Sequence, residues 1–181
     1  MSATRSRVVA LPGVFRPRSD ARLLAAVMSE HDLARNAKAL DLFTGSGVLA
    51  IAAMHAGARS MTAVDLSRRA VATVRLNALR NGVRVRAVRG DLFAPVAGER
   101  FDLIVANPPY LPGVERLPRR GAARAWEGGR DGRELVDRLC DGARDHLAPG
   151  GRLLLVQSSL TGEQATLERL ALNGLDAELL A

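Results

Sequence analysis

Short apolar runs alternate with longer amphipathic segments along most of this chain. The runs lie at 39–43, 60–64, 83–89, 101–106 and 152–157, with a sixth candidate at 175–180. Between the runs, apolar residues recur at helical spacing, as they do at Leu23, Leu24, Val27 and Met28. Strands that alternate with helices favour a parallel sheet covered on both faces. The pattern therefore predicts an α/β fold with a doubly wound, mostly parallel sheet.

Capping and turn residues set the expected helix ends. The first helix is expected from Ser19 to about Arg35, with Ser19 or Asp20 as its N-cap. Asp131 and Glu134 have the spacing of a capping box at the start of a later helix. Helices are expected at 19–35, 48–57, 67–80, 131–147 and 162–172. Folds of this class usually end in an antiparallel hairpin, so either that hairpin is incomplete here or the sheet has six strands.

Polar groups follow the first three strands. Asp41 lies within the first strand, and a turn with Gly45 and Gly47 leads from it into a helix. The backbone N–H groups of such a turn can approach a nucleotide-like ligand closely. Asp65, after the second strand, is placed to accept hydrogen bonds from both hydroxyls of a ribose. Asp91, after the third strand, can accept a hydrogen bond from an exocyclic amine. These ends share one edge of a parallel sheet, which predicts a nucleoside-containing ligand there.

The fourth strand ends in Asn107-Pro108-Pro109-Tyr110. Two successive prolines allow neither a helix nor a strand ladder, so the chain must leave the sheet in a rigid turn. Amide and carbonyl oxygens of this turn can accept the hydrogens of a planar nitrogen while the tyrosine ring packs on its face. The turn is therefore typical of methyl transfer to an amide or amino nitrogen.

A nicotinamide enzyme is the rival interpretation. The segment 45–50 fits the dinucleotide fingerprint, and Asp65 follows about 20 residues later. However, the carboxylate of Asp41 would not bind the negatively charged diphosphate of such a cofactor. In addition, the fourth strand ends in the Pro-Pro turn and not in a hydride-transfer triad. The combination favours a methyltransferase.

With these motifs, the chain resembles the class I S-adenosylmethionine-dependent methyltransferases, and among them the HemK-type release-factor glutamine methyltransferases. The segments that carry the resemblance are 13–20, 41–47, 64–65, 90–92, 107–110 and 125–134. The last segment, which contains Trp126 and a run of glycines, is similar to the short, single-domain branch of that family. This branch acts on release factors of the eukaryotic and archaeal type.

The resemblance implies S-adenosylmethionine as the cofactor and S-adenosylhomocysteine as its product. Catalysis is assigned to Asn107, Pro108, Pro109 and Tyr110. The cofactor-binding residues expected are Phe15, Pro17, Asp41, Thr44, Gly45, Gly47, Asp65, Leu66, Asp91, Leu92 and Asn107. The substrate-binding residues expected are Tyr110, Trp126, Gly128 and Gly129, although Trp126 could equally pack the loop and the glycines could serve only to turn the backbone.

Length and composition fit one domain over 1–181, in which 1–37 forms a segment and helix over the cofactor site. At 181 residues and 48% hydrophobic, the chain can bury a sizeable core. There is no membrane-spanning run, Cys140 is the single cysteine, and His31, His55 and His146 lack metal-ligand spacing, so a cytoplasmic protein without a metal is expected.

Charge bears on the partners. The net charge is +7, and arginines cluster after the Asn107–Tyr110 turn, at Arg116, Arg119, Arg120, Arg124, Arg130 and Arg133. This arginine-rich rim could contact nucleic acid or be a solvated loop. Short family members commonly pair an edge strand with a zinc-binding activator. The outward arginines of 83–89 predict that this chain acts without one.

Three functions remain open from sequence. The first is methylation of a glutamine side chain in a protein, such as the Gly-Gly-Gln loop of a release factor. The second is adenine-N6 methylation of RNA or DNA. The third is a cofactor-binding partner protein without catalysis.

Overall fold

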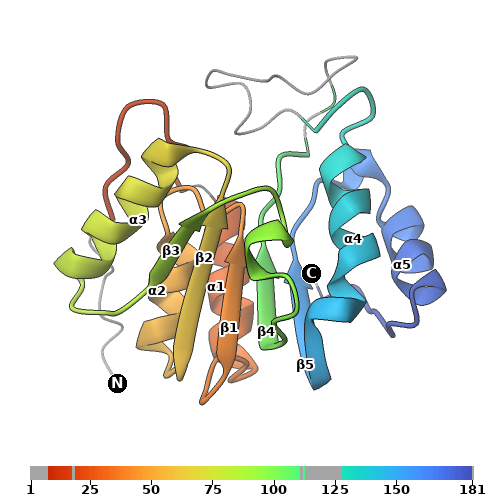
Figure 1. Cartoon of the computed structure of the whole chain (residues 1–181). Coiled ribbons are helices and arrows are strands. Elements are labelled where there is room, and N and C mark those ends of the chain that lie inside the picture. The colour runs from red at the N-terminus through yellow and green to blue at the C-terminus, as the bar shows by residue number, and fades with distance from the viewer. Residues whose placement is uncertain (1–7, 18, 111, 113–127, 181) are drawn as a thin grey trace.

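A five-stranded parallel sheet forms the centre of the computed structural model, which describes residues 8–17, 19–110, 112 and 128–180 (Figure 1). The strand order is β3-β2-β1-β4-β5, and each neighbouring pair is parallel. The strands are β1 (Lys38–Leu42), β2 (Ser60–Asp65), β3 (Arg86–Arg89), β4 (Phe101–Ala106) and β5 (Leu147–Leu155). The expected doubly wound sheet is confirmed.

Helices cover both faces of this sheet (Figure 1). They are α1 (Ser19–Glu30), α2 (Val48–His55), α3 (Arg68–Arg80), α4 (Glu134–His146) and α5 (Glu163–Leu172). The first three pack on one face, where Leu24, Ala50 and Val74 join one buried cluster. On the other face α4 packs with the short 3₁₀ helix η1 (Ala94–Val96), and α5 lies beside α4. Alternation along the strands separates the two cores, since Ala39 belongs to the first and Leu40 to the second.

The strand order reverses between β1 and β4. From β1 the chain builds outward through β2 to β3, and then returns to place β4 on the other side of β1. Ligands of open α/β sheets bind beyond the carboxyl ends of the strands at such a switch point. Leu42 is in register with Ala106, so the chain leaves β1 and β4 at the same level. The glycine turn and the Asn107–Tyr110 turn are thereby brought together.

Several element ends differ from the sequence-based expectation. The first helix ends at Glu30, because Asp32 and Asn36 take positive φ angles of 51° and 56° that a right-handed helix does not admit. The third strand begins only at Arg86. The fifth runs from Leu147 to Leu155 instead of 152–157, with a register shift opposite Phe101 and Leu103.

The predicted caps of α1 and α4 are wrong. Ser19 and Asp20 lie inside the first turn of α1. Helix α4 starts at Glu134, two residues later than the capping-box spacing implies, because Gly132 has a φ of 77° and cannot belong to a right-handed helix. The Asp131 carboxylate instead accepts a hydrogen bond from the backbone N–H of Arg133, at 2.9 Å, in an Asx turn.

The sixth strand is also not formed, because residues 175–180 pair with no strand of the described sheet. Leu175 instead lies in the turn that follows α5, where its N–H donates to the Leu170 carbonyl and its side chain packs against the cluster between α4 and α5. Residues 176–180 are exposed, so no buried face holds them against the sheet.

Candidate active site

Asp41 is the most deeply buried polar group at the switch point. Its carboxylate has no exposed surface, and its Oδ2 accepts hydrogen bonds from Thr44 Oγ1 (2.6 Å) and from the backbone N–H of Ala50 (3.2 Å). Its Oδ1 has no hydrogen-bond partner among the described residues. Burial raises the pKa of Asp41 to about 7, against the opposing effect of the two hydrogen bonds. A buried carboxylate oxygen that lacks a donor suits a cationic group of a ligand.

The turn after β1 has a backbone shape that depends on glycine. Gly45 and Gly47 have φ angles of 53° and 80°. A Cβ atom on Gly47 would lie 3.0 Å from a methyl carbon of Val74, so α3 packs directly on the turn. The Phe15 backbone and Cβ lie about 4 Å from the corresponding position on Gly45. The N-terminal segment therefore reaches the predicted cofactor cradle at Phe15. The expected contacts of Phe15 and Pro17 with the cofactor stay predictions.

Asn77 is a residue of this region that the sequence analysis missed. It is fully buried on α3, and its Nδ2 donates to the carbonyls of Ser46 (2.9 Å) and Val9 (2.7 Å). Its Oδ1 accepts from the Val9 N–H at 3.1 Å. One amide therefore fastens both the glycine turn and the N-terminal segment to α3. An asparagine at a core-facing helical position was the only signal available in the sequence.

Asp65 joins two turns at the end of β2. Its Oδ2 accepts from the Gly45 N–H at 2.9 Å, and its Oδ1 accepts from the Ser67 N–H at 2.8 Å. The carboxylate is half-buried, and each oxygen has a second lone pair. Leu66 beside it is exposed. The structure thus gives Asp65 an organising role in the cradle beside the ribose contact expected for it.

Asp91 forms an ion pair with an arginine of α4. Arg138 on α4 donates to its Oδ2 at 2.8 Å, and both side chains are exposed. Leu92, with a φ of 46°, turns inward and is nearly buried. A Cβ atom on Gly90 would lie 2.5 Å from Pro95, so this turn is closely packed. A ligand amine at Asp91 would have to share the carboxylate with Arg138.

The Asn107–Tyr110 turn leaves β4 where the sequence placed it. Asn107 and Tyr110 are half-buried, whereas Pro108 and Pro109 are buried. The Tyr110 hydroxyl donates to the carboxylate of Asp20 in the first turn of α1. Asp20 is therefore a second residue near the site that sequence analysis had assigned to another role, since it was expected to cap the helix.

Glycines after residue 127 pack against the back of this turn. A Cβ atom on Gly128 would lie 2.8 Å from the Pro109 carbonyl oxygen, and one on Gly132 would collide with the Tyr110 carbonyl oxygen. Gly129 has a φ of 92°. The Gly128–Gly132 loop thus needs glycine for a close backbone approach to the turn. The predicted substrate contacts of Gly128 and Gly129 stay predictions, and Trp126 lies outside the described residues.

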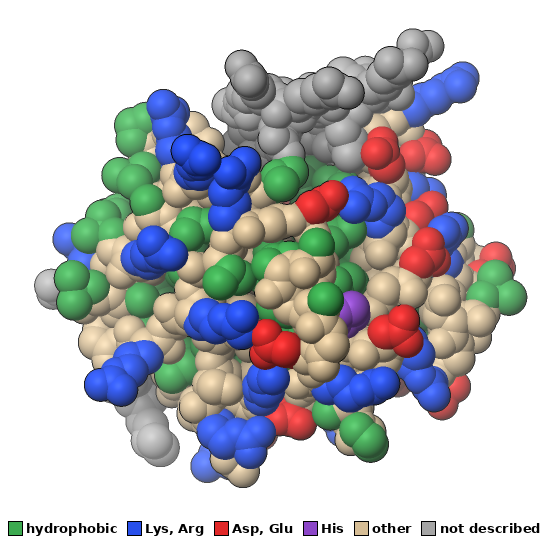
Figure 2. Space-filling model, viewed as in Figure 1, with side chains coloured by type: hydrophobic (Ala, Val, Ile, Leu, Met, Phe, Trp, Pro, Cys, Tyr) green, Lys and Arg blue, Asp and Glu red, His purple; other side chains and the backbone are tan. Residues whose placement is uncertain are grey.

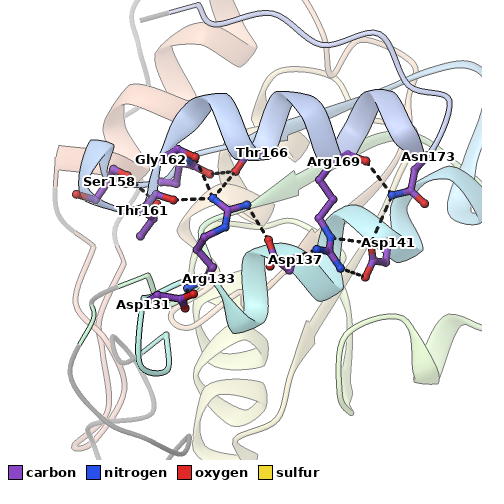
Figure 3. Close-up of polar contacts among 11 residues, drawn as sticks. Asp131, Arg133, Asp137, Asp141, Ser158, Thr161, Gly162, Thr166, Arg169 and Asn173 are labelled. Carbon is purple, nitrogen blue, oxygen red and sulfur yellow. Dashed lines mark hydrogen bonds and ion pairs between the residues drawn. The ribbon is translucent and has the colours of Figure 1, made fainter.

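Arg133 fixes this loop to the rest of the molecule (Figure 3). Its guanidinium donates to the carbonyls of Thr161 (2.6 Å) and Gly162 (2.9 Å), to Thr166 Oγ1 (3.1 Å), and to Asp137 (2.7 Å). Only 14% of its side chain is exposed, so its assignment to the arginine-rich rim was wrong. Of the other rim residues, Arg130 is exposed, and Arg116, Arg119, Arg120 and Arg124 lie outside the described residues.

A metal has no evident place in the described ranges, which hold no group of three or more His, Cys, Asp or Glu side chains suited to one. None of the helices described has the length and apolar character needed to cross a bilayer.

Comparison with known proteins identifies the family. Residues 5–120 match the family model "Methyltransferase small domain". A relative from Methanocaldococcus jannaschii, named "Putative protein N5-glutamine methyltransferase", is 36% identical over 94% of this chain and 85% of its own length. The release factor glutamine methyltransferase of Geobacter sulfurreducens is 35% identical over 81% of this chain. The chain spans only 54% of that bacterial protein.

A solved structure shares the fold. The Thermus thermophilus 16S rRNA N2 G1207 methyltransferase, determined with AdoMet and guanosine, superposes with a TM-score of 0.68 and 26% identity, covering 88% of this chain and 40% of that one. Together with the match to the family model, this supports the use of S-adenosylmethionine. The chain belongs to the methyltransferase small domain family and, within it, to the protein-glutamine methyltransferases.

Proposed function

We propose that this protein transfers a methyl group from S-adenosylmethionine to the side-chain amide nitrogen of a glutamine in a protein, with a Gly-Gly-Gln loop of a release factor as the acceptor. The observation that carries the proposal is the position of the Asn107–Tyr110 turn. It leaves the sheet at the switch point, level with the end of β1 and the buried Asp41. The names of the relatives support the choice of a glutamine acceptor.

The residues around β1 fit the cofactor. The unpartnered Oδ1 of Asp41 would receive its ammonium group, and the turn with Thr44, Gly45 and Gly47 would lie along its amino-acid and ribose portions. Asp65 would take the ribose hydroxyls, and Asp91 and Leu92 would bound the adenine. Phe15, Pro17 and Leu66 would border the pocket.

When bound, S-adenosylmethionine supplies an activated methyl group on a sulfonium. The protein must then hold a poor nucleophile, because the lone pair of an amide nitrogen is delocalised into its carbonyl. The side-chain oxygen of Asn107 and the backbone carbonyl of Pro108 would accept the two amide hydrogens and orient the nitrogen toward the methyl carbon. These oxygens would stabilise the positive charge that develops on the nitrogen as the methyl group passes to it from sulfur, which would leave S-adenosylhomocysteine as the product. The proton leaves afterwards to solvent.

Tyr110 would cover the plane of the acceptor amide. Its hydroxyl is held by Asp20, and its backbone is backed by the Gly128–Gly132 loop. The contact with α1 thus restrains the ring and the loop restrains the backbone of Tyr110, which together limit the positions the ring can take over a bound amide.

We further propose that transfer needs no zinc-binding activator. The exposed arginines of β3 protect that edge of the sheet from strand pairing. Arg75 of α3 adds to this protection, because it donates to the backbone carbonyl of Ala87 on β3 at 3.0 Å.

The test is incubation of the protein, expressed alone, with tritiated S-adenosylmethionine and a cell extract. Label should enter a fraction that protease destroys and nuclease does not. Asn107→Ala should lower transfer by at least about 100-fold, because one of the two charge-stabilising oxygens is removed, while S-adenosylhomocysteine still binds. Nuclease-sensitive label would favour adenine methylation. Binding without transfer to any fraction would favour a non-catalytic partner. Activity that appears only with a co-purified zinc protein would contradict the activator proposal.

A further inference from the structure

The positive charge of this protein is concentrated in one segment. Residues 66–90 contain seven arginines and no aspartate or glutamate. The whole chain has 26 basic and 19 acidic residues, so the rest of the chain holds 19 of each and is neutral. The formal charge of +7 therefore lies entirely between Asp65 and Asp91. A general preference for arginine does not explain this, because acids are frequent on both sides of the segment.

The fold gathers these arginines on one side of the molecule. Residues 66–90 form α3 and the edge strand β3, which pack against each other. All seven side chains are exposed. On the face drawn in Figure 2, blue side chains spread over the side that carries α3 and β3, and the red ones lie toward the middle and toward α4 and α5. We call this the α3–β3 face: Arg68, Arg69, Arg75, Arg80, Arg84, Arg86 and Arg89.

The charges on this face are largely unneutralised. Among the described residues, only Arg86 has a carboxylate partner, Glu99, at 2.6 Å. Arg69, Arg75 and Arg89 donate to backbone carbonyls, which orient the guanidinium groups without cancelling their charge. The arginines near α4 and α5 are different, because their charges are paired. Arg133, at the N-cap of α4, and Arg169, on α5, form ion pairs with aspartates of α4.

We propose that the α3–β3 face binds the phosphodiester backbone of a nucleic acid. Guanidinium groups match phosphate oxygens in geometry and charge. From Arg68 to Arg80 the helix extends about 18 Å, roughly the length of five nucleotide steps of a strand. Protein–protein interfaces use arginine together with aromatic side chains, and residues 66–90 contain no aromatic residue. Here arginines occupy both elements, with Leu76 and Leu79 as large exposed apolar neighbours on α3.

This face is distinct from the proposed methyl-acceptor site. It would hold the enzyme on a nucleic-acid-containing particle while the Asn107–Tyr110 turn acts on a protein. Binding through phosphates is independent of base sequence and weakens steeply with salt.

The test measures fluorescence anisotropy of a labelled RNA duplex, and of a DNA duplex of the same length, across a salt series. The double variant Arg80→Gln/Arg84→Gln should bind about tenfold more weakly at low salt. Its slope of log affinity against log salt should be smaller by about two, one for each phosphate that an arginine no longer neutralises. The control Arg22→Gln/Arg152→Gln removes the same charge from exposed positions on α1 and β5 and should leave the slope unchanged.

The outcomes separate cleanly. Binding of only one of the two duplexes identifies the nucleic acid and supports the proposal. The proposal is overturned if neither duplex binds, or if the two double variants weaken binding equally. It is also overturned if the protein binds polyglutamate, an acidic polypeptide, and binds neither duplex. Methyl transfer to a peptide acceptor by the Arg80→Gln/Arg84→Gln variant should match wild type. Thermal melting of both variants confirms that they are folded. Failure of this inference therefore leaves the proposed function untouched, and the reverse also holds.

Discussion

At the scale of single residues, the site depends on carboxylates whose partners differ sharply. Asp65 accepts two backbone N–H groups, Asp91 meets an exposed arginine, and Asp41 is buried with one oxygen unpartnered in the described structure. The sequence could place all three at strand ends, because each follows or lies in an apolar run. It could not show that Arg138 reaches Asp91, since that contact joins segments 47 residues apart.

The raised pKa of Asp41 makes the stability of the cofactor-free protein depend on pH. The pKa is about 7 in the folded protein and 3.8 for an ordinary aspartate, so the folded state favours the protonated form. This contribution is complete below about pH 4 and is lost as the pH rises through 7, at up to about 1.4 kcal/mol per unit. Urea unfolding of wild type and Asp41→Asn, compared from pH 4 to 8, should show that trend in their difference.

The same variant bears on cofactor binding. Loss of the carboxylate removes the partner proposed for the ammonium group, so S-adenosylhomocysteine should bind at least about tenfold more weakly at pH 8, as calorimetry would measure. A difference in stability that does not change with pH, together with unchanged affinity, would show that Asp41 is neither titrating near neutrality nor facing the cofactor.

At the scale of elements, the Asn107–Tyr110 turn contacts segments that the sequence did not connect to it. The two prolines predicted the turn after β4, and the run of glycines predicted a loop near residue 128. That the loop backs onto the turn follows only from three-dimensional packing at Gly128 and Gly132. Asp20 and Asn77 were missed for the same reason, because each acts through a contact at least 31 residues away in the chain.

Arg133 offers a test of that support. Arg133→Met removes the hydrogen bonds that hold the loop to Thr161 and Gly162, so kcat/KM should fall about tenfold as Tyr110 loses its backing. Arg169→Met is the matched control, because Arg169 also joins α4 to α5 through Asp137 and Asp141 but contacts no described part of the loop. Melting temperatures of both variants report the structural cost. Equal losses of kcat/KM at equal stability would show that Arg133 has no special link to the site.

At the scale of the whole molecule, strand order and charge distribution place the two proposed sites. The doubly wound sheet was predicted from the alternation of apolar runs and helices, and its ligand-binding edge from the polar residues that end those runs. The strand order and its switch point came only from the structure. The short-range features were less predictable, because positive φ angles set the end of α1 and the start of α4, and a register shift interrupts the pairing of β5. The tail after α5 shows the same limit, since Leu175 packs into the core and does not begin a strand.

The most direct measurement is mass spectrometry of a purified release factor after incubation with this protein and S-adenosylmethionine carrying a trideuterated methyl group. The account predicts one labelled methyl on the side-chain nitrogen of the glutamine in the Gly-Gly-Gln loop, and none with Asn107→Ala. Label on a lysine, on the chain terminus or on co-purified nucleic acid, with that glutamine unmodified, would contradict it.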